Sequence, residues 1–276
     1  MGDLIPLFPL GTPLFPGVVL PLQIFEPRYR RLMDDLLAHP ESGDQRFFGV
    51  VAIRQGWEVE KIAPAEALYD IGCTARVQAV RPQADGGFRI VTVGGERFRL
   101  VEVVIGDDVP YLQAEVEWLA EEEMAEEAAG DHDGIVDPVG LIVPSVAAAG
   151  LDDVVASVAR GSMDVLSRNV RDLFTRYVAE VADLGAGGGG EGEPTVDAET
   201  AVLLHAVSGD PAALSYLVAS AALLTTEDRQ ALLAESATRR RLAAESRLLR
   251  RELTLLQELG AVPVPLRQFA APMTVN

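Results

Sequence analysis

The sequence is short of the residues on which several common kinds of site depend. Lys61 is the only lysine among 276 residues, and it stands in Glu58-Val59-Glu60-Lys61-Ile62, away from any glycine-rich stretch. A phosphate-binding loop needs a lysine beside a glycine-rich backbone cradle, so a nucleotide site of that type is excluded. Cys73 is the only cysteine, which rules out a disulfide within the chain. Its apolar surroundings predict a small, buried and unreactive side chain.

Histidine is also scarce, and none of the three histidines has the setting of a ligand or a catalytic base. His39 precedes a proline, His132 lies in an acidic loop and His205 follows two leucines on a predicted helix. The spacing needed for a structural zinc site is absent, and Asp131-His132-Asp133-Gly134 lacks the third ligand and closing glutamate of a calcium loop. No Gly-x-Ser-x-Gly elbow accompanies these histidines. We therefore predict no metal, no cofactor and no catalytic residue.

Acidic side chains far outnumber basic ones and give the chain a net charge of −19. The excess is concentrated in residues 119–193, which carry 16 acidic and 4 basic side chains. Such a surface repels phosphate backbones and anionic lipid, so we expect no nucleic-acid and no membrane partner. With one cysteine and no secretion signal, we expect a cytoplasmic protein.

Residues 4–25 carry no formal charge, but they do not have the pattern of a membrane span. Prolines at positions 6, 9, 13, 16 and 21 forbid one continuous helix. Because proline cannot donate to a strand ladder, we expect two short strands, Leu4–Phe8 and Val18–Phe25, at sheet edges or bulges of a small irregular barrel.

The rest of residues 1–118 predicts further strands and one helix. Pro27 is suited to the first helical position, an apolar stripe starts at Tyr29, and His39-Pro40 ends the helix. Asp85-Gly86-Gly87 predicts a hairpin turn, and Gly94-Gly95 predicts a second turn between strands. The further strands are expected at Phe47–Arg54, Ala67–Val80, Phe88–Val93, Arg97–Val104 and Tyr111–Trp118.

The second half of the chain has a helical pattern. We predict an acidic connector at 119–137, a helical bundle at 138–260 with a flexible glycine-rich loop at 185–193, and a proline-rich extended tail at 261–276. Within the bundle, Asp210-Pro211 predicts the N-cap and first position of one helix. The last helix is expected to start at Thr225 or Thr226 and to run to Gly260. Its inward side chains are predicted to be Leu232, Leu233, Leu242, Leu249, Leu253 and Leu256.

Several spaced motifs occur in order along residues 4–118. They are Leu7-Phe8-Pro9-Leu10, Leu14-Phe15-Pro16-Gly17, Pro21-Leu22-Gln23-Ile24-Phe25-Glu26-Pro27-Arg28-Tyr29, Phe48-Gly49-Val50-Val51, Ile71-Gly72-Cys73-Thr74-Ala75 and Gly94-Gly95-Glu96-Arg97-Phe98. Together they resemble the amino-terminal domain of Lon proteases, and more closely the free-standing bacterial proteins that consist of that domain alone. Over residues 119–260 the resemblance rests on helical pattern.

The resemblance implies an α+β fold in which a PUA-like β pseudo-barrel with one helix precedes a C-terminal α-helical bundle. It also implies that the barrel and its neighbouring helix bind unfolded or client protein. Full Lon proteases carry an ATPase module and a Ser–Lys dyad, which together need at least two lysines. A chain with one lysine cannot supply both, so the resemblance does not extend to their catalysis.

The strand–helix turn is the candidate protein-binding site that this resemblance points to, through Phe25, Glu26, Arg28 and Tyr29. A structural interpretation of the same residues is open as well. In that interpretation Glu26 and Arg28 cap the helix and pair with each other, while Tyr29 packs inward.

Three functions are compatible with these patterns. The first is a non-catalytic protein-recognition module in protein quality control, whose partners are unfolded or client proteins and a protease that receives them. The second is RNA binding, which other PUA-type barrels perform but which the acidic balance opposes. The third is a small-molecule enzyme with an unrecognised site. A basic groove would favour the second and a deep pocket with converging polar groups the third; we take the first as our prediction.

Overall fold

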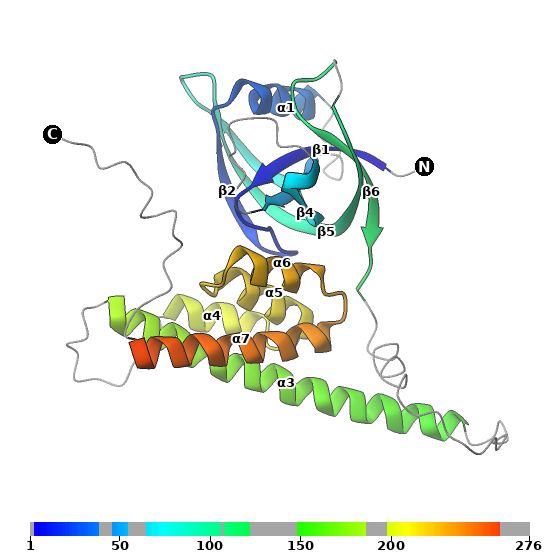
Figure 1. The fold of residues 1–276 in the computed structure, drawn as a ribbon, viewed down its shortest axis with the longest axis vertical. Coiled ribbons are helices and arrows are strands. Elements are labelled where there is room, and N and C mark those ends of the chain that lie inside the picture. The colour runs from blue at the N-terminus through cyan, green and yellow to red at the C-terminus, as the bar shows by residue number, and fades with distance from the viewer. Residues whose placement is uncertain are drawn as a thin grey trace. The chain divides into compact units, whose positions relative to one another are not determined.

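The computed structural model describes residues 3–38, 46–54, 65–105, 108–121, 148–185 and 198–259. The chain divides into two compact units. Figure 1 labels most of their helices and strands. The first unit consists of residues 1–121 together with 226–236, and the second of residues 122–225 together with 237–276. Residues 226–236, which the sequence pattern assigned to the helical bundle, thus belong to the first unit. Most of the predicted connector and loop, and all of the predicted tail, lie outside the described residues.

The first unit is built on a mixed six-stranded sheet. Its strand order is β2-β5-β4-β3-β1-β6, and β5 pairs with β6 as well. Five strands therefore form a closed circuit, to which β2 is added along the first part of β5. The β1–β3 pair is parallel and the other pairs are antiparallel. The strands are β1 Asp3–Leu10, β2 Val19–Ile24, β3 Phe47–Ile53, β4 Leu68–Pro82, β5 Phe88–Val104 and β6 Gln113–Leu119, with a short 3-10 helix at Ala65–Ala67.

The turn predicted at Gly94-Gly95 is wrong, because both residues lie inside β5. Glycine is required there for close approach of another segment. The Gly94 N–H donates to the Val18 carbonyl at 2.9 Å, and the Gly94 carbonyl accepts from the Gly17 N–H at 2.9 Å. A Cβ at position 94 would overlap the carbonyl oxygen of Phe15. The two predicted strands are therefore one strand with a glycine at a crossing point.

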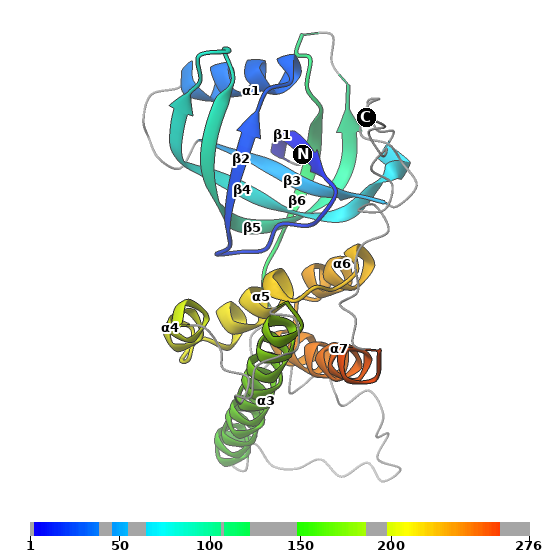
Figure 2. The same cartoon turned by 90° about the vertical axis from the view of Figure 1, so that its left-hand side faces the viewer.

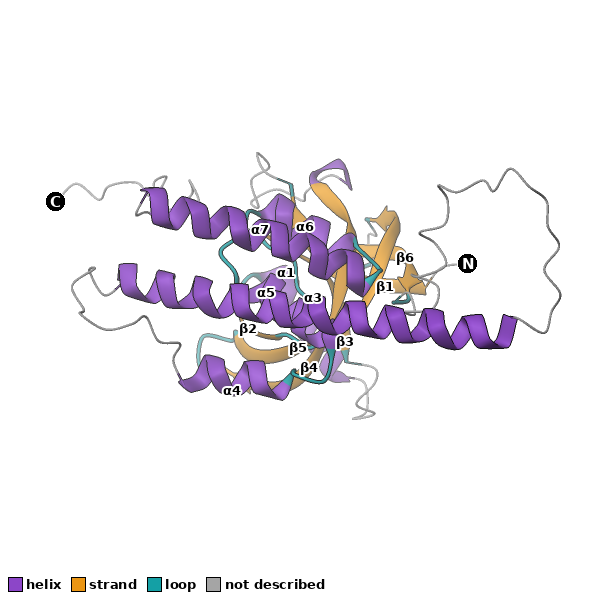
Figure 3. Cartoon of the chain, turned by 90° about the horizontal axis from the view of Figure 1, so that it is seen from below, coloured by secondary structure: helices purple, strands orange, loops and turns teal. Residues whose placement is uncertain are grey.

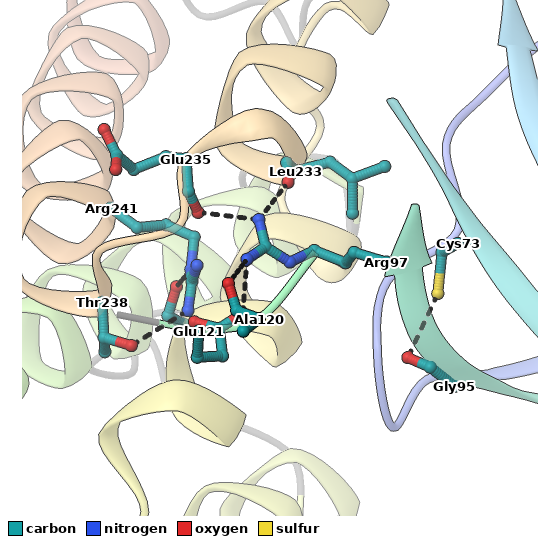
Figure 4. A network of polar contacts seen from close by, with 10 residues as sticks. Cys73, Gly95, Arg97, Ala120, Glu121, Leu233, Glu235, Thr238 and Arg241 are labelled. Carbon is teal, nitrogen blue, oxygen red and sulfur yellow. Dashed lines mark hydrogen bonds and ion pairs between the residues drawn. The ribbon is translucent and has the colours of Figure 1, made fainter. Parts of the chain in front are cut away.

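The turn predicted at Asp85-Gly86-Gly87 is confirmed. It connects β4 to β5, with Gly86 at a φ of 78° and the Gly87 N–H donating to Asp85 Oδ1 at 2.9 Å. Glycine reaches this positive φ without steric cost. The predicted burial of Cys73 is confirmed too, and its thiol lies 3.5 Å from the Gly95 carbonyl (Figure 4). Burial raises the pKa of this thiol to about 12.

The helix predicted after Pro27 is confirmed as α1, Pro27–Ala38, which lies at one end of the strands (Figures 1 and 2). The predicted stripe faces inward as its period requires. Its buried members are Tyr29, Leu32, Met33 and Leu36. A separate buried cluster forms the apolar core of the strand circuit. Its members are Ile5, Leu7, Val51, Ile53, Ala67, Leu68, Phe98, Leu112, Ala114 and Val116.

The remaining described helices are α3 Ala148–Gly185, α4 Ala198–Ala206, α5 Pro211–Ala221, α6 Thr226–Ala234 and α7 Thr238–Leu259. In the second unit α3 and α7 run alongside each other (Figure 3). Their shared core is apolar and takes in residues of α4 and α5. The predicted start of α5 is confirmed, because Asp210 Oδ1 accepts a hydrogen bond from the Ala213 N–H at 2.9 Å. Among the described helices, none is long and apolar enough to cross a membrane.

A buried polar group lies between α5 and α7 of the second unit. Glu245 Oε1 accepts a hydrogen bond from the Ser215 hydroxyl at 2.8 Å, and Arg241 Nε donates to the same hydroxyl at 2.7 Å. Glu245 Oε2 is buried and has no hydrogen-bond partner in the described part of the chain. Burial therefore raises the pKa of this carboxyl well above its ordinary value, against the smaller opposing effects of Ser215 and Arg241.

The single last helix predicted from Thr225 or Thr226 to Gly260 is wrong. Residues 235–237 separate α6 from α7, and the six predicted inward leucines are all buried but are divided between the two helices. Helix α6 packs with the sheet, where Gln230 Nε2 donates to the Ile71 carbonyl at 2.8 Å and Arg229 Nη1 donates to Thr12 Oγ1 at 2.9 Å.

Arg97 on β5 binds the carboxyl end of α6 (Figure 4). Its guanidinium donates to the carbonyls of Leu233 at 2.9 Å and Glu235 at 3.1 Å, and it also reaches the Ala120 carbonyl at 3.2 Å and the Glu121 carboxylate at 2.9 Å. The last carbonyls of a helix have no partner within the helix. A side chain from the sheet thus caps α6, in the manner of a basic residue at a helix C-terminus.

Candidate functional site

The turn between β2 and α1 contains the four predicted site residues. Phe25 is 61% exposed, although it is a large apolar side chain. The Glu26 carbonyl accepts hydrogen bonds from the N–H groups of Tyr29 at 3.1 Å and Arg30 at 2.9 Å, which closes the first turn of α1. The strand therefore passes directly into the helix and leaves the Phe25 ring in solvent.

Glu26, Arg28 and Tyr29 interact with one another. Arg28 Nη2 lies 2.7 Å from Glu26 Oε2, and the guanidinium carbon lies 4.7 Å from the centre of the Tyr29 ring. The Tyr29 ring is 5% exposed and stacks on Phe8, with ring centres 4.1 Å apart. Burial raises the pKa of Tyr29 to about 12, while Arg28 lowers and Glu26 raises it to a smaller extent. The internal pair and the inward ring of the structural interpretation are both present.

A groove of about 250 Å³ opens beside this turn. Two of its walls come from the end of β1 and the end of β2, and Tyr29 contributes from α1. Its lining residues are Phe8, Pro9, Leu10, Gly11, Leu22, Gln23, Ile24, Phe25, Glu26 and Tyr29. Glu26 is the one charged residue in the lining, and its carboxylate is paired with Arg28. The groove is therefore apolar with little net charge, and it is not basic.

The groove contains three of the four predicted residues. Phe25, Glu26 and Tyr29 line it, whereas Arg28 lies outside the lining and holds the Glu26 carboxylate. The β1 wall was missed as a site element, although Leu7-Phe8-Pro9-Leu10 was among the motifs that carried the resemblance. Protein binding by the four predicted residues stays a prediction, and the groove is the surface on which it would take place.

Pro9 on β1 and Pro21 on β2 occupy positions where the missing N–H costs no ladder bond. The Val18 carbonyl accepts from Gly94, so alternation directs the main chain of even-numbered β2 residues to β5 and that of Pro21 away from it. On β1 the Leu7 N–H donates to the Leu112 carbonyl on the side away from β3. The same alternation directs the main-chain nitrogen of Pro9 away from β3. This is the edge placement that proline requires in a sheet.

The comparisons with known proteins agree with this fold. The family model of the ATP-dependent protease La (LON) substrate-binding domain matches residues 4–251. The chain belongs to the Lon substrate-binding domain family. The resemblance to the amino-terminal domain of Lon proteases is thus confirmed, and it extends from the β part of the chain into its helical part.

Curated relatives of this Lon-type chain are much longer proteins. "Lon protease 1" of Herpetosiphon aurantiacus is 28% identical over 258 residues, which cover 92% of this chain and 25% of that protein. "Lon protease 2" of Syntrophobacter fumaroxidans is 36% identical over 109 residues, which cover 40% of this chain and 13% of that protein. The chain therefore spans a quarter or less of the length of these two relatives.

Two solved structures cover nearly the whole Lon-type chain. The N-terminal domain of Mycobacterium avium complex Lon protease is 17% identical, with a TM-score of 0.52 over 90% of this chain and 98% of that one. The Lon N-terminal domain protein from Xanthomonas campestris is 21% identical, with a TM-score of 0.48 over 95% and 99% of the two chains. The likeness to the mycobacterial domain supports the mixed sheet with helices as a Lon N-terminal domain fold.

Proposed function

We propose that this protein is a non-catalytic recognition module that binds unfolded or client polypeptide in the groove between β1 and β2. The observation that carries the proposal is the apolar lining of the groove, with the exposed Phe25 ring at its rim. A large apolar side chain held in solvent beside an apolar groove is typical of a binding surface. Membership of a family of protease substrate-binding domains supports the same role.

Protein clients fit this site better than the other two candidate ligands. RNA would meet a lining whose one charged residue is acidic, on a chain of net charge −19. We interpret the closed strand circuit as a PUA-like pseudo-barrel and helices α3, α4, α5 and α7 as a bundle, and the groove on this barrel is not basic. A small-molecule enzyme would need converging polar groups, and the described residues hold no cluster of His, Cys, Asp and Glu able to bind a metal.

The absence of catalysis is part of the proposal. A single lysine cannot provide both the phosphate-binding lysine of an ATPase module and the lysine of a Ser–Lys dyad. The domain would instead hold the client, and a protease would be the partner that receives it. Purified protein is expected to hydrolyse neither ATP nor casein, as measured by phosphate release and by peptide release.

The test is a pair of alanine substitutions at equally exposed apolar residues. Phe25→Ala removes the ring at the groove rim, whereas Val101→Ala changes a β5 residue that is 60% exposed and outside the groove. Both should leave the thermal midpoint nearly unchanged, because little buried area is lost. Binding of a reduced, alkylated and fluorescently labelled unfolded protein should weaken about fivefold in Phe25→Ala only, a loss of roughly 1 kcal/mol. Equal affinity in the two variants would contradict the proposed function.

A further inference from the structure

β2 has one hydrogen-bonded edge and one open edge. Among the described strands it stands at the end of the strand order and pairs with β5 alone, beside which it runs in Figure 2. Because even-numbered residues direct their main-chain groups to β5, those of Val19, Pro21 and Gln23 face the open edge. Antiparallel pairing alternates in this way along every strand.

The two halves of this open edge differ. Pro21 has no N–H to offer, and neither Val19 nor Pro21 lines the groove. Gln23 keeps both an N–H and a carbonyl, and no described residue forms a hydrogen bond with either. The groove adjoins Leu22, Gln23, Ile24 and Phe25. The proline half has the chemistry of a protected edge, and the half next to the groove does not.

We propose that the segment Leu22–Phe25 binds its client by strand addition, in which a short extended segment pairs with the main chain of Gln23. The proposal rests on the function proposed above and adds the binding mode and the class of segment that is recognised. The Gln23 N–H would donate to a client carbonyl, and the Gln23 carbonyl would accept from a client N–H. Alternate client side chains would then enter the groove, as in other cases of strand addition.

The charges and the size of the groove define this occupant. The one charged residue in the lining, Glu26, is neutralised by Arg28, so the complementary segment is apolar and uncharged. A volume of about 250 Å³ lies below the roughly 300–1,000 Å³ of small-molecule pockets. An amphipathic helix would satisfy its own backbone and leave the Gln23 groups unpaired. An extended peptide is the occupant that uses both the groove and the open edge.

The residue of the client that faces Gln23 must carry an N–H. A fluorescein-labelled peptide of sequence Gly-Ser-Val-Leu-Val-Phe-Thr-Leu-Ser-Gly is the probe, together with copies N-methylated at single central positions. Methylation at alternate positions should weaken binding at least fivefold, while methylation at the positions between should change it less than twofold. Binding by side chains alone would give no such alternation.

Gln23→Pro is the matching change in the protein, and Val19→Pro is its control. Each substitution removes an open-edge N–H without removing a bond to β5, so the thermal midpoint should be kept in both, while peptide binding should fall at least fivefold in Gln23→Pro. Val19 is 60% exposed and lies outside the groove lining, so Val19→Pro should bind within twofold of the parent. If Gln23→Pro does not fold, the methylated peptides decide alone.

The outcomes separate this inference from the proposed function. Phe25-dependent binding of the unfolded protein, without alternation among the methylated peptides, would overturn strand addition and leave the recognition function in place. Loss of the Phe25 dependence itself would overturn both.

Discussion

Replacement of Arg97 by alanine should destabilise the first unit by about 4 kcal/mol. The Arg97 side chain is 2% exposed, and its guanidinium contacts three carbonyls and one carboxylate. The carbonyls of Leu233, Glu235 and Ala120 would lose this donor, and the loss of the partner of a buried polar group costs roughly 1–3 kcal/mol. The three losses arise from one side chain and overlap, so we expect about 4 kcal/mol rather than their full sum.

Urea unfolding, together with hydrogen exchange of the α6 amides, measures this effect. Glu121→Ala is the matched control, because its side chain is 37% exposed and its removal leaves the three carbonyl contacts of Arg97 in place. This control should lose about 1 kcal/mol or less. Arg97→Lys keeps the charge but not the planar fork, and should lie between the two. A loss below about 1 kcal/mol in Arg97→Ala, or unchanged protection of α6, would refute the role assigned to Arg97.

Three further perturbations follow from the described contacts. Tyr29→Ala should lower stability by about 3 kcal/mol, because the ring is buried against Phe8; a urea midpoint equal to the parent's would show that this packing contributes little. Gly94→Ala should cost about 3 kcal/mol, since the added methyl overlaps the Phe15 carbonyl; a circular dichroism melt measures it, and a change within about 0.5 kcal/mol would mean that this segment moves freely. The raised pKa of Glu245 means that the folded state keeps a proton that the unfolded state releases above about pH 4.5. Stability should therefore fall as pH rises from about 4.5 toward the folded pKa, and Glu245→Gln should remove that decline in melts from about pH 5 to 8; identical slopes in the two proteins would contradict it.

Local patterns predicted the elements whose causes are local. The Pro27 start and the apolar stripe of α1, the Asp85-Gly86-Gly87 turn and the Asp210 cap depend on residues within a few positions of each other. Gly94-Gly95 was misassigned because glycine serves both turns and close crossings, and only the packed segment at Phe15 distinguishes them.

The break between α6 and α7 and one wall of the groove depend on distant residues. Residues 235–237 contain neither glycine nor proline, and the capping donor for α6 comes from Arg97, far away in the sequence. The candidate site was predicted on its contiguous side, Phe25–Tyr29. Its β1 side depends on a strand order in which β1 pairs in parallel with β3, which no local pattern encodes.

The place of α6 in the first unit has a consequence for the order in which the chain can fold during translation. Residues 226–236 are synthesised after the ribosome has passed more than a hundred residues of the second unit. At about 5–20 residues per second, the sheet would wait on the order of ten seconds for this helix. During that interval the Arg97 guanidinium has no α6 carbonyls to bind, and the Ile71 carbonyl has no Gln230. A nascent chain of this protein would therefore itself expose an incomplete sheet until its last helices emerge.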